Sequence, residues 1–210
     1  MRRRVQVGVL IALLLGTPAL AKPLKLVVLG DSLSAGYGLK AGEGFCDQLE
    51  KALRADGFDV SVVNSGVSGD TAEDGLARYD WSVPADSDAM ILELGANDML
   101  RGNPVPEAKA ALVGIIDKAK AARLPLLIAG MKAPANLGAD YRAAFDAMYP
   151  DLAARAGAPL YPFFLAGVAG DSGLNQSDGM HPTAAGVGVV VKAMLGVVEG
   201  WLRGIAAARG

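Results

Sequence analysis

Three side chains in this sequence could together make a hydroxyl group nucleophilic. His181 is the single histidine of the chain, so any imidazole chemistry depends on it. Asp178 lies three residues before His181, close enough along the chain to hold its ring. Ser32 follows an apolar run, and a serine hydroxyl becomes reactive when a base takes its proton. These residue types indicate acyl transfer, with Ser32 as nucleophile, His181 as base and Asp178 as the group that orients the base.

Attack on a carbonyl group creates an oxyanion, which needs hydrogen-bond donors already aimed at it. Three donors are plausible in this sequence: the backbone N–H of Ser32, the backbone N–H of Gly69 and the side-chain amide of Asn97. A glycine at position 69 lets the backbone approach a substrate without a Cβ in the way. We therefore expect Ser32, Gly69 and Asn97 to form an oxyanion hole.

Short apolar runs alternate with segments of helical periodicity, and these elements must position the three groups. Strands are predicted at 24–29, 60–63, 89–94, 126–129 and 159–161, and helices at 43–56, 70–79, 106–123, 139–156 and 183–202. The strands are apolar throughout, which is typical of a parallel sheet covered by helices on both faces. The pattern predicts an α/β fold in one domain, with the site beyond the carboxyl ends of the strands.

Composition and charge exclude several classes of function. The chain has 210 residues and a formal net charge of −2, which gives no sign of nucleic-acid binding. A single cysteine, Cys46, excludes an internal disulfide framework, and a single histidine excludes a clustered-histidine metal site. We interpret Asp31, Asp70 and Asp98 as cap and loop-bracing groups, so no metal and no cofactor is predicted.

The first 21 residues have the pattern of a secretory signal peptide. A basic start, 1–4, precedes an apolar run, 5–15, and 19–21 reads Ala-Leu-Ala, a typical cleavage site. An uncleaved membrane anchor is the alternative, but the run is shorter than the roughly 20 residues that a spanning helix needs. We expect 22–210 to be the mature domain, a periplasmic or secreted monomer that is not inserted stably in a membrane.

Four segments resemble the SGNH (GDSL) hydrolase family in order and spacing. They are 29–37, 63–71, 92–98 and 178–182, and they extend over almost the whole predicted mature chain. The resemblance implies a flavodoxin-like three-layer α/β/α sandwich, the SGNH hydrolase fold, whose five parallel strands have the order 2-1-3-4-5. It implies Ser32, Asp178 and His181 as the triad, with Gly69 and Asn97 in the oxyanion hole.

The resemblance also suggests substrates and a substrate-binding loop. Aryl esters, acyl thioesters and lysophospholipids are the small molecules that it implies. The segment 131–138 resembles the family's loop after the fourth strand, which helps to line the acyl site. The implied substrate-binding residues there are Met131, Pro134, Asn136 and Leu137. Position 96 is alanine, where the family often has glycine, and this difference could alter the pocket wall.

Other interpretations of the same residues remain open. Ser32 could be only a helix N-cap, and His181 could be a structural histidine. The letters Gly-Asp-Ser recur at 170–172, where no apolar strand precedes them, so we interpret that copy as a surface turn. No G-x-S-x-G occurs, which disfavours a nucleophile-elbow hydrolase. A carbohydrate acetylesterase and a non-catalytic ligand-binding domain on the same fold are the rival functions.

Overall fold

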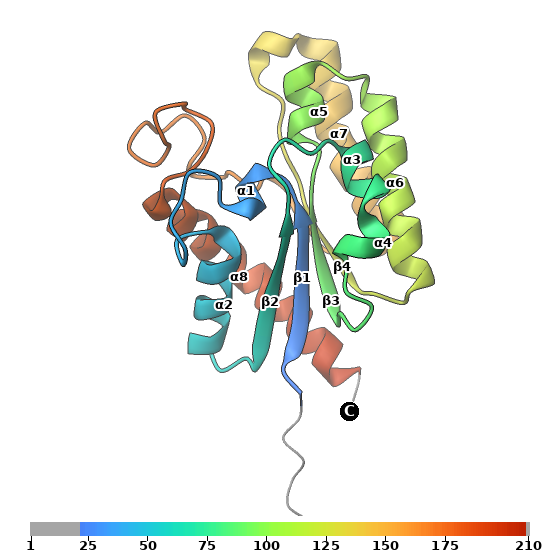
Figure 1. Cartoon of the computed structure of the whole chain (residues 1–210). Coiled ribbons are helices and arrows are strands. Elements are labelled where there is room, and N and C mark those ends of the chain that lie inside the picture. Colours follow the sequence, from blue (N-terminus) through green and yellow to red (C-terminus); the bar gives the residue numbers. More distant parts are fainter. Residues whose placement is uncertain (1–21, 209–210) are drawn as a thin grey trace, which may run out of the picture.

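The computed structural model describes residues 22–208, and a parallel five-stranded sheet lies at their centre (Figure 1). Its strands are β1 (Leu24–Gly30), β2 (Val60–Gly66), β3 (Ala89–Glu93), β4 (Leu126–Ala129) and β5 (Leu160–Tyr161). Their order is β2-β1-β3-β4-β5, and every neighbouring pair is parallel. The predicted sheet and its order are confirmed. The predicted signal peptide, 1–21, lies outside the described residues.

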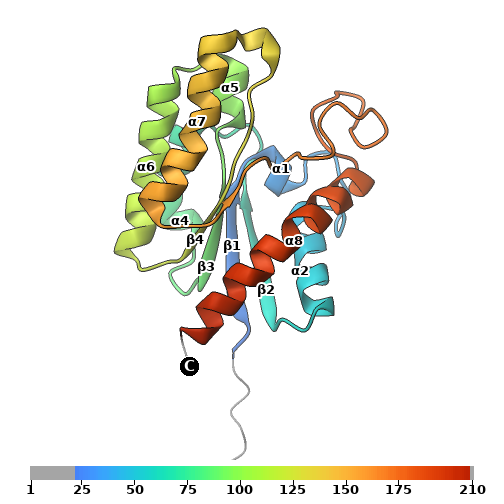
Figure 2. The same cartoon turned by 180° about the vertical axis from the view of Figure 1, so that it is seen from behind.

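Helices cover both faces of the sheet, which confirms the predicted three-layer sandwich. Figures 1 and 2 show α2 (Phe45–Ala55) and α8 (Ala184–Ala207) on one face. The other face carries α3 (Ala72–Ala77), α4 (Tyr79–Ser82), α6 (Val105–Ala121) and α7 (Ala139–Ala156). Three short elements follow strands at the carboxyl edge: α1 (Ser32–Ala35), α5 (Ala96–Arg101) and a 3-10 helix, η1 (Ala135–Leu137).

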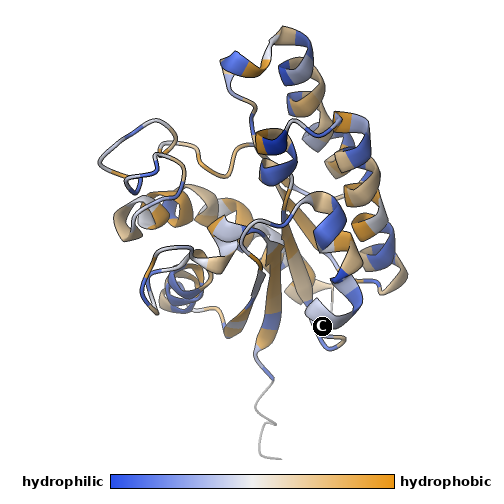
Figure 3. Ribbon diagram, turned by 45° about the horizontal axis from the view of Figure 1, so that its top comes forward, coloured by the Kyte–Doolittle hydropathy of each residue, from blue (hydrophilic) through white to orange (hydrophobic). Residues whose placement is uncertain are grey.

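The central strands form the core because apolar side chains point to both faces. Residues 26–29 of β1 are fully buried, and so are nearly all of β3 and β4. Figure 3 shows these strands as the hydrophobic centre of the molecule, with hydrophilic residues gathered on the outer sides of the helices. Burial on both faces explains why the strands show no alternation of apolar and polar residues.

The helices follow from periodicity and from their end signals. In α2, Phe45, Leu49 and Leu53 recur every four residues and are buried. Thr183 caps α8 by accepting a hydrogen bond from the backbone N–H of Gly186.

By length and composition α8 could cross a membrane, but residues along it are buried in the fold, where it packs against α2. The buried apolar residues of α8, which include Val190, Met194 and Val198, belong to the hydrophobic core.

The predicted helix 70–79 is wrong in extent. The chain forms two helices there, α3 and α4. Arg78 is both the C-cap of α3 and the N-cap of α4. Thr71 begins α3 with a capping box, in which its side chain and that of Asp74 each accept a hydrogen bond from the other's backbone N–H. Residues 70 and 71 therefore belong to the loop before the helix, and the backbone carbonyl of Asp70 there accepts a hydrogen bond from Asn97.

The register brings three loops to the same edge of the sheet. Gly30 pairs with Gly66 on one side and with Glu93 on the other, so β1, β2 and β3 end level with one another. A Cβ at position 30 would lie 2.3 Å from the Oγ of Ser34 and 2.6 Å from the Oε2 of Glu93. Only glycine fits at this crowded strand end, directly before Asp31 and Ser32.

Candidate active site

Ser32 is the first residue of the short helix α1, and its hydroxyl does not serve as the helix cap. Asp31 is the N-cap, and its side chain accepts a hydrogen bond of 3.0 Å from the backbone N–H of Leu33. The Ser32 Oγ instead lies 2.9 Å from the Nε2 of His181. The interpretation of Ser32 as only an N-cap is therefore wrong, because Asp31 takes that role.

His181 stands between Ser32 and Asp178. Its Nδ1 is 2.7 Å from the Oδ2 of Asp178, while its Nε2 faces the Ser32 hydroxyl. The Oδ1 of Asp178 accepts hydrogen bonds from the backbone N–H groups of Met180 and His181, at 2.9 Å and 3.0 Å. These backbone bonds are the main reason that the pKa of Asp178 falls to about 2. Asp178 is therefore a carboxylate at neutral pH, and the hydrogen-bonded chain can transfer a proton away from a serine hydroxyl.

Asn97 lines the cavity with Ser32, and its amide contacts the Asp70 carbonyl in the loop after β2 that carries Gly69. Gly69 itself is not among the residues that line the cavity. Asn97 is the second residue of α5, and its Nδ2 donates to the carbonyl of Asp70 at 2.9 Å and to the Oδ2 of Asp31 at 3.3 Å. Gly69 has a φ of +91°, which side chains rarely allow, and its carbonyl accepts a 2.6 Å hydrogen bond from the Nη2 of Arg101. The Asn97 amide is therefore a side-chain donor in the same cavity wall as the serine.

Two buried carboxyl groups, those of Asp31 and Glu93, lie at the strand ends next to Ser32. Asp31 was predicted only as a cap or loop-bracing group, and Glu93 was not predicted as a site residue. Glu93 is fully buried, and its Oε2 accepts a 2.7 Å hydrogen bond from the Oγ of Ser34. Burial, reinforced by the charge of Asp31, raises the pKa of Glu93 well above its usual range. Burial also raises the pKa of Asp31 to about 6. A charged residue inside the apolar run 89–94 was the sequence signal for Glu93.

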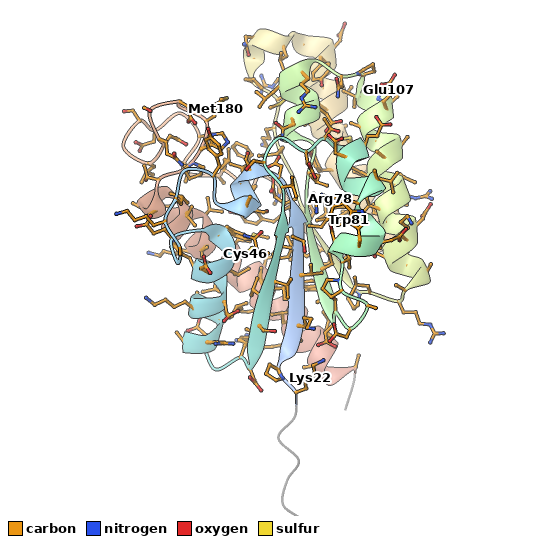
Figure 4. The ribbon with its side chains drawn as sticks, in the orientation of Figure 1. Lys22, Cys46, Arg78, Trp81, Glu107 and Met180 are labelled. Carbon is orange, nitrogen blue, oxygen red and sulfur yellow. The ribbon has the colours of Figure 1, made fainter. Side chains whose placement is uncertain are left out.

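A buried arginine holds the loop that carries Gly69. Arg78 forms an ion pair with Asp70 and donates to the backbone carbonyls of Ser65 and Gly30, at 2.8 Å and 2.9 Å. It reaches from the end of α3 toward the strands, as Figure 4 shows. One guanidinium thus ties the ends of β1 and β2 to the loop after β2. Its charge is paired with Asp70, and each of its three nitrogens donates a hydrogen bond. Sequence reasoning gave no indication of this contact.

A cavity of about 250 Å³ opens beside the serine. Ser32, Asn97 and His181 line it, and most of its remaining wall is apolar. The apolar lining residues include Leu33, Met99, Leu100, Met131, Phe163, Leu165 and Met180. Met180 lies on the loop before α8, labelled in Figure 4. An apolar cavity with a few convergent polar groups suits a substrate that has a hydrophobic acyl chain.

The predicted substrate-binding residues divide into two groups. Met131, two residues after β4, lines the cavity together with its neighbour Lys132. Pro134, Asn136 and Leu137 are not among the lining residues, because the chain beyond residue 133 turns into η1. Asn136 is exposed on η1, whereas Leu137 packs against the edge of the core. In this structure the loop therefore contributes its beginning, rather than its middle, to the cavity.

Comparison with known proteins gives the same family over most of the chain. The model of the GDSL-like lipase/acylhydrolase family matches residues 28–189. Esterase TesA of Pseudomonas aeruginosa is 39% identical over 186 residues, which cover 88% of this chain and 92% of that protein. Thioesterase 1/protease 1/lysophospholipase L1 of Escherichia coli is 39% identical over 158 residues, covering 75% of this chain and 74% of that protein.

A solved structure agrees with this assignment. The crystal structure of AlinE4, an esterase of the SGNH-hydrolase family, is 43% identical in sequence and superposes with a TM-score of 0.73. The superposition covers 86% of this chain and 97% of that one. Family model, relatives and fold all point to one conclusion: the chain belongs to the GDSL-like lipase/acylhydrolase family.

Proposed function

We propose that this protein is a serine ester hydrolase that works through an acyl-enzyme. The single observation that carries the proposal is the hydrogen-bonded series from Asp178 through His181 to Ser32, which ends at an apolar cavity. Relatives whose names describe an esterase and a thioesterase support ester hydrolysis as the general activity.

In the proposed reaction, the Ser32 Oγ attacks the carbonyl carbon while His181 Nε2 takes its proton. The Asp178 carboxylate holds the ring in the correct tautomer and stabilises the imidazolium that forms. His181 then gives the proton to the leaving alcohol or thiol, and the acyl group stays on Ser32. Water, activated by His181, attacks this ester, and the acid leaves with Ser32 restored.

The backbone N–H groups of Ser32 and Gly69 and the Asn97 amide would stabilise the oxyanion in both steps. Asn97 Nδ2 has two hydrogens, and its contact with Asp31 is the longer of its two hydrogen bonds. We expect the substrate oxygen to replace that longer contact, while the bond to the Asp70 carbonyl keeps the amide in place. Each oxyanion donor is worth about 3 kcal/mol of the barrier in such sites.

The substrates that we propose are aryl esters, short-to-medium acyl esters, acyl thioesters and lysophospholipids. The apolar wall of the cavity favours an acyl chain over the polar surface of a carbohydrate. Hydrolysis of p-nitrophenyl esters from two to sixteen carbons, an acyl-CoA, a lysophospholipid and acetyl-xylan tests this directly. We expect turnover of the acyl esters. Turnover of acetyl-xylan alone would favour a carbohydrate acetylesterase, and no turnover with any of them would favour a binding domain.

We also propose that the protein is exported, with cleavage of a signal peptide after residue 21. The basic start, the apolar run and the Ala-Leu-Ala sequence support this assignment. Expression of the full chain in a Gram-negative host, followed by fractionation and intact-mass measurement, tests it. We expect a periplasmic or secreted protein that begins at Lys22 and elutes as a monomer, and an uncleaved chain in the membrane fraction would contradict the proposal.

A further inference from the structure

The proposed base lies on a long segment between β5 and α8 that consists of turns and bends. Residues 162–183 form this segment, which we call the base loop. Figure 1 shows it in orange, extending beyond the sheet beside α1. Ser32, in contrast, follows directly from a buried strand. The base loop has internal contacts, such as the bridge between Asn175 and Pro182, and contacts with the loop after α1. Both sets of contacts help to set the distance between Ser32 and His181.

Gln176 bonds to both of these loops. Its backbone N–H donates to the carbonyl of His181 at 2.7 Å. Its side-chain Nε2 donates to the carbonyl of Pro182 at 3.0 Å and to the carbonyl of Tyr37 at 2.8 Å. The amide also packs closely against Gly38, where a Cβ would lie 2.2 Å from the Gln176 Oε1. One amide group thus joins the chain next to His181 to the chain five residues after Ser32.

Tyr37 contacts the imidazole itself. The centres of the Tyr37 and His181 rings are 4.6 Å apart, with an angle of 39° between their planes. The cavity lining includes His181 but not Tyr37, so this contact is made outside the cavity. Tyr37 is 53% exposed, and its ring therefore contributes little to the burial that stabilises the fold. What the Tyr37 ring does provide is its contact with the imidazole of His181.

We propose that Tyr37 and Gln176 are positioning residues for His181. Tyr37 supports one side of the imidazole ring, and Gln176 fixes the Tyr37 backbone to the base loop, so that His181 Nε2 stays within hydrogen-bond distance of the Ser32 Oγ. The two residues act through His181, and neither of them lines the cavity. This inference rests on the proposed function, because it concerns the same base and the same proton transfer.

The variants Tyr37→Ala, Tyr37→Phe and Gln176→Ala test the inference, with Trp81→Ala as the matched control. Trp81 is a 76% exposed aromatic residue on α4, well away from the base loop in Figure 4. For each protein, kcat and KM for a p-nitrophenyl ester, the second-order rate of labelling by a fluorophosphonate and the Tm would be measured. The labelling rate reports the activation of Ser32 without complete turnover.

Loss of the ring support should lower kcat and the labelling rate together. We expect Tyr37→Ala and Gln176→Ala each to lower both by about 10-fold or more, since a small displacement of a catalytic group can cost about 100-fold. KM should change by less than about twofold, because Tyr37 lies outside the cavity. Tyr37→Phe, which keeps the ring, and Trp81→Ala should stay within about twofold of the wild type in kcat.

The double variant Tyr37→Ala/Gln176→Ala tests whether the two residues act on the same distance. Its loss of kcat should then be clearly smaller than the product of the two single losses. Multiplied losses would contradict a shared role, and a Tyr37→Ala enzyme with wild-type kcat would overturn the inference. Equal losses in Tyr37→Phe and Tyr37→Ala would overturn it as well, because they would assign the effect to the hydroxyl group.

Two further controls keep these outcomes separate from other failures. If Tyr37→Ala does not fold, Tyr37→Leu takes its place under the same criteria, since leucine keeps apolar bulk but no ring. A wild-type protein that neither hydrolyses esters nor reacts with the fluorophosphonate would contradict the proposed function itself. Wild-type activity with unchanged Tyr37 and Gln176 variants would contradict only the positioning role.

Discussion

Ser32 and His181 are 149 residues apart in the sequence, yet the Ser32 Oγ and the His181 Nε2 lie 2.9 Å apart. Ser32 is positioned by the end of β1 and His181 by the loop before α8, so the strands β2 to β5 lie between the two residues along the chain. Residues so distant form a hydrogen bond only when the complete fold is in place. Activity that depends on this pair is therefore a sensitive measure of the folded state.

Asp178→Asn should lower kcat by about 1,000-fold or more while leaving the fold intact. The amide can still accept from the backbone N–H groups of Met180 and His181, but it can also donate to the His181 Nδ1. Donation there favours the tautomer whose Nε2 already carries a proton and cannot act as base. Steady-state kinetics with a p-nitrophenyl ester measure the loss, and a kcat within tenfold of wild type would argue against the role of Asp178.

Asp178 also has a predicted pH signature. Its pKa is lowered to about 2 in the folded protein, so its carboxylate stabilises the fold above the pKa of the unfolded state, near 3.8. This stabilisation is lost only as the pH falls from about 4 through about 2. The titration of Asp178 should therefore not change the difference in unfolding free energy between wild type and Asp178→Asn between pH 4 and 8. Urea unfolding at several pH values in that range measures this difference.

Asn97→Ala should lower kcat about 100-fold to 1,000-fold with little change in KM. The reason is that the amide would bind the oxyanion more strongly than the ground-state carbonyl oxygen. The variant also loses the bond to the Asp70 carbonyl, so its Tm must be measured alongside its kinetics. A raised KM with unchanged kcat would instead assign Asn97 to ordinary substrate binding.

Glu93→Gln should stabilise the protein increasingly as the pH rises. Burial raises the pKa of Glu93 in the folded state above the usual value of 4.5, so the folded carboxyl keeps its proton where the unfolded one has lost it. Wild-type stability from this group is therefore complete below pH 4.5 and declines as the pH rises toward the folded pKa, by at most about 1.4 kcal/mol per pH unit.

Glutamine has no such proton, and its carbonyl oxygen can still accept the hydrogen bond from Ser34. The gap in unfolding free energy between Glu93→Gln and wild type should thus grow between pH 5 and pH 8. Urea unfolding at several pH values measures that gap. A gap that is constant with pH would mean that Glu93 is ionised in the folded protein.

Met131→Val should shift the preferred acyl chain toward greater length. Met131 is 4% exposed and lines the cavity, so a shorter side chain should enlarge the space for the acyl group at a cost of about 1–2 kcal/mol in stability. Leu137→Ala, on η1 outside the cavity lining, should leave the chain-length profile unchanged. Profiles over p-nitrophenyl esters compare the two, and a shift in Leu137→Ala alone would place the acyl site at η1.

The long elements could be predicted from the sequence because their patterns are local. The strand Leu126–Ala129 and the helix Ala139–Ala156 have the predicted bounds, since an apolar run and a glycine after the helix mark them clearly. The helix Ala96–Arg101 was not predicted, and for Ser32–Ala35 only a helix start near Ser32 was expected, because six and four residues are too few for a periodic pattern. Their existence depends on capping by Asp31 and on packing at the carboxyl edge.

The hydrogen-bonded series of Ser32, His181 and Asp178 could be predicted because the chain has a single histidine, with an aspartate three residues before it. The groups that hold it could not. Arg78 looks like an ordinary surface residue in the sequence, and only the assembled strand ends offer it the carbonyls of Gly30 and Ser65. The contact of Tyr37 with His181 likewise connects parts of the chain that no local pattern relates. Tertiary contacts of this kind appear only in the folded protein.

Intact-mass measurement after reaction with a fluorophosphonate tests the central claim most directly. The account predicts one phosphonyl adduct on the wild-type protein, mapped by peptide analysis to Ser32. It predicts no adduct and no ester hydrolysis for Ser32→Ala at an unchanged Tm, and normal labelling for Ser172→Ala, which alters the second Gly-Asp-Ser sequence. An adduct that persists in Ser32→Ala, or a wild-type protein that hydrolyses esters without being labelled at Ser32, would contradict it.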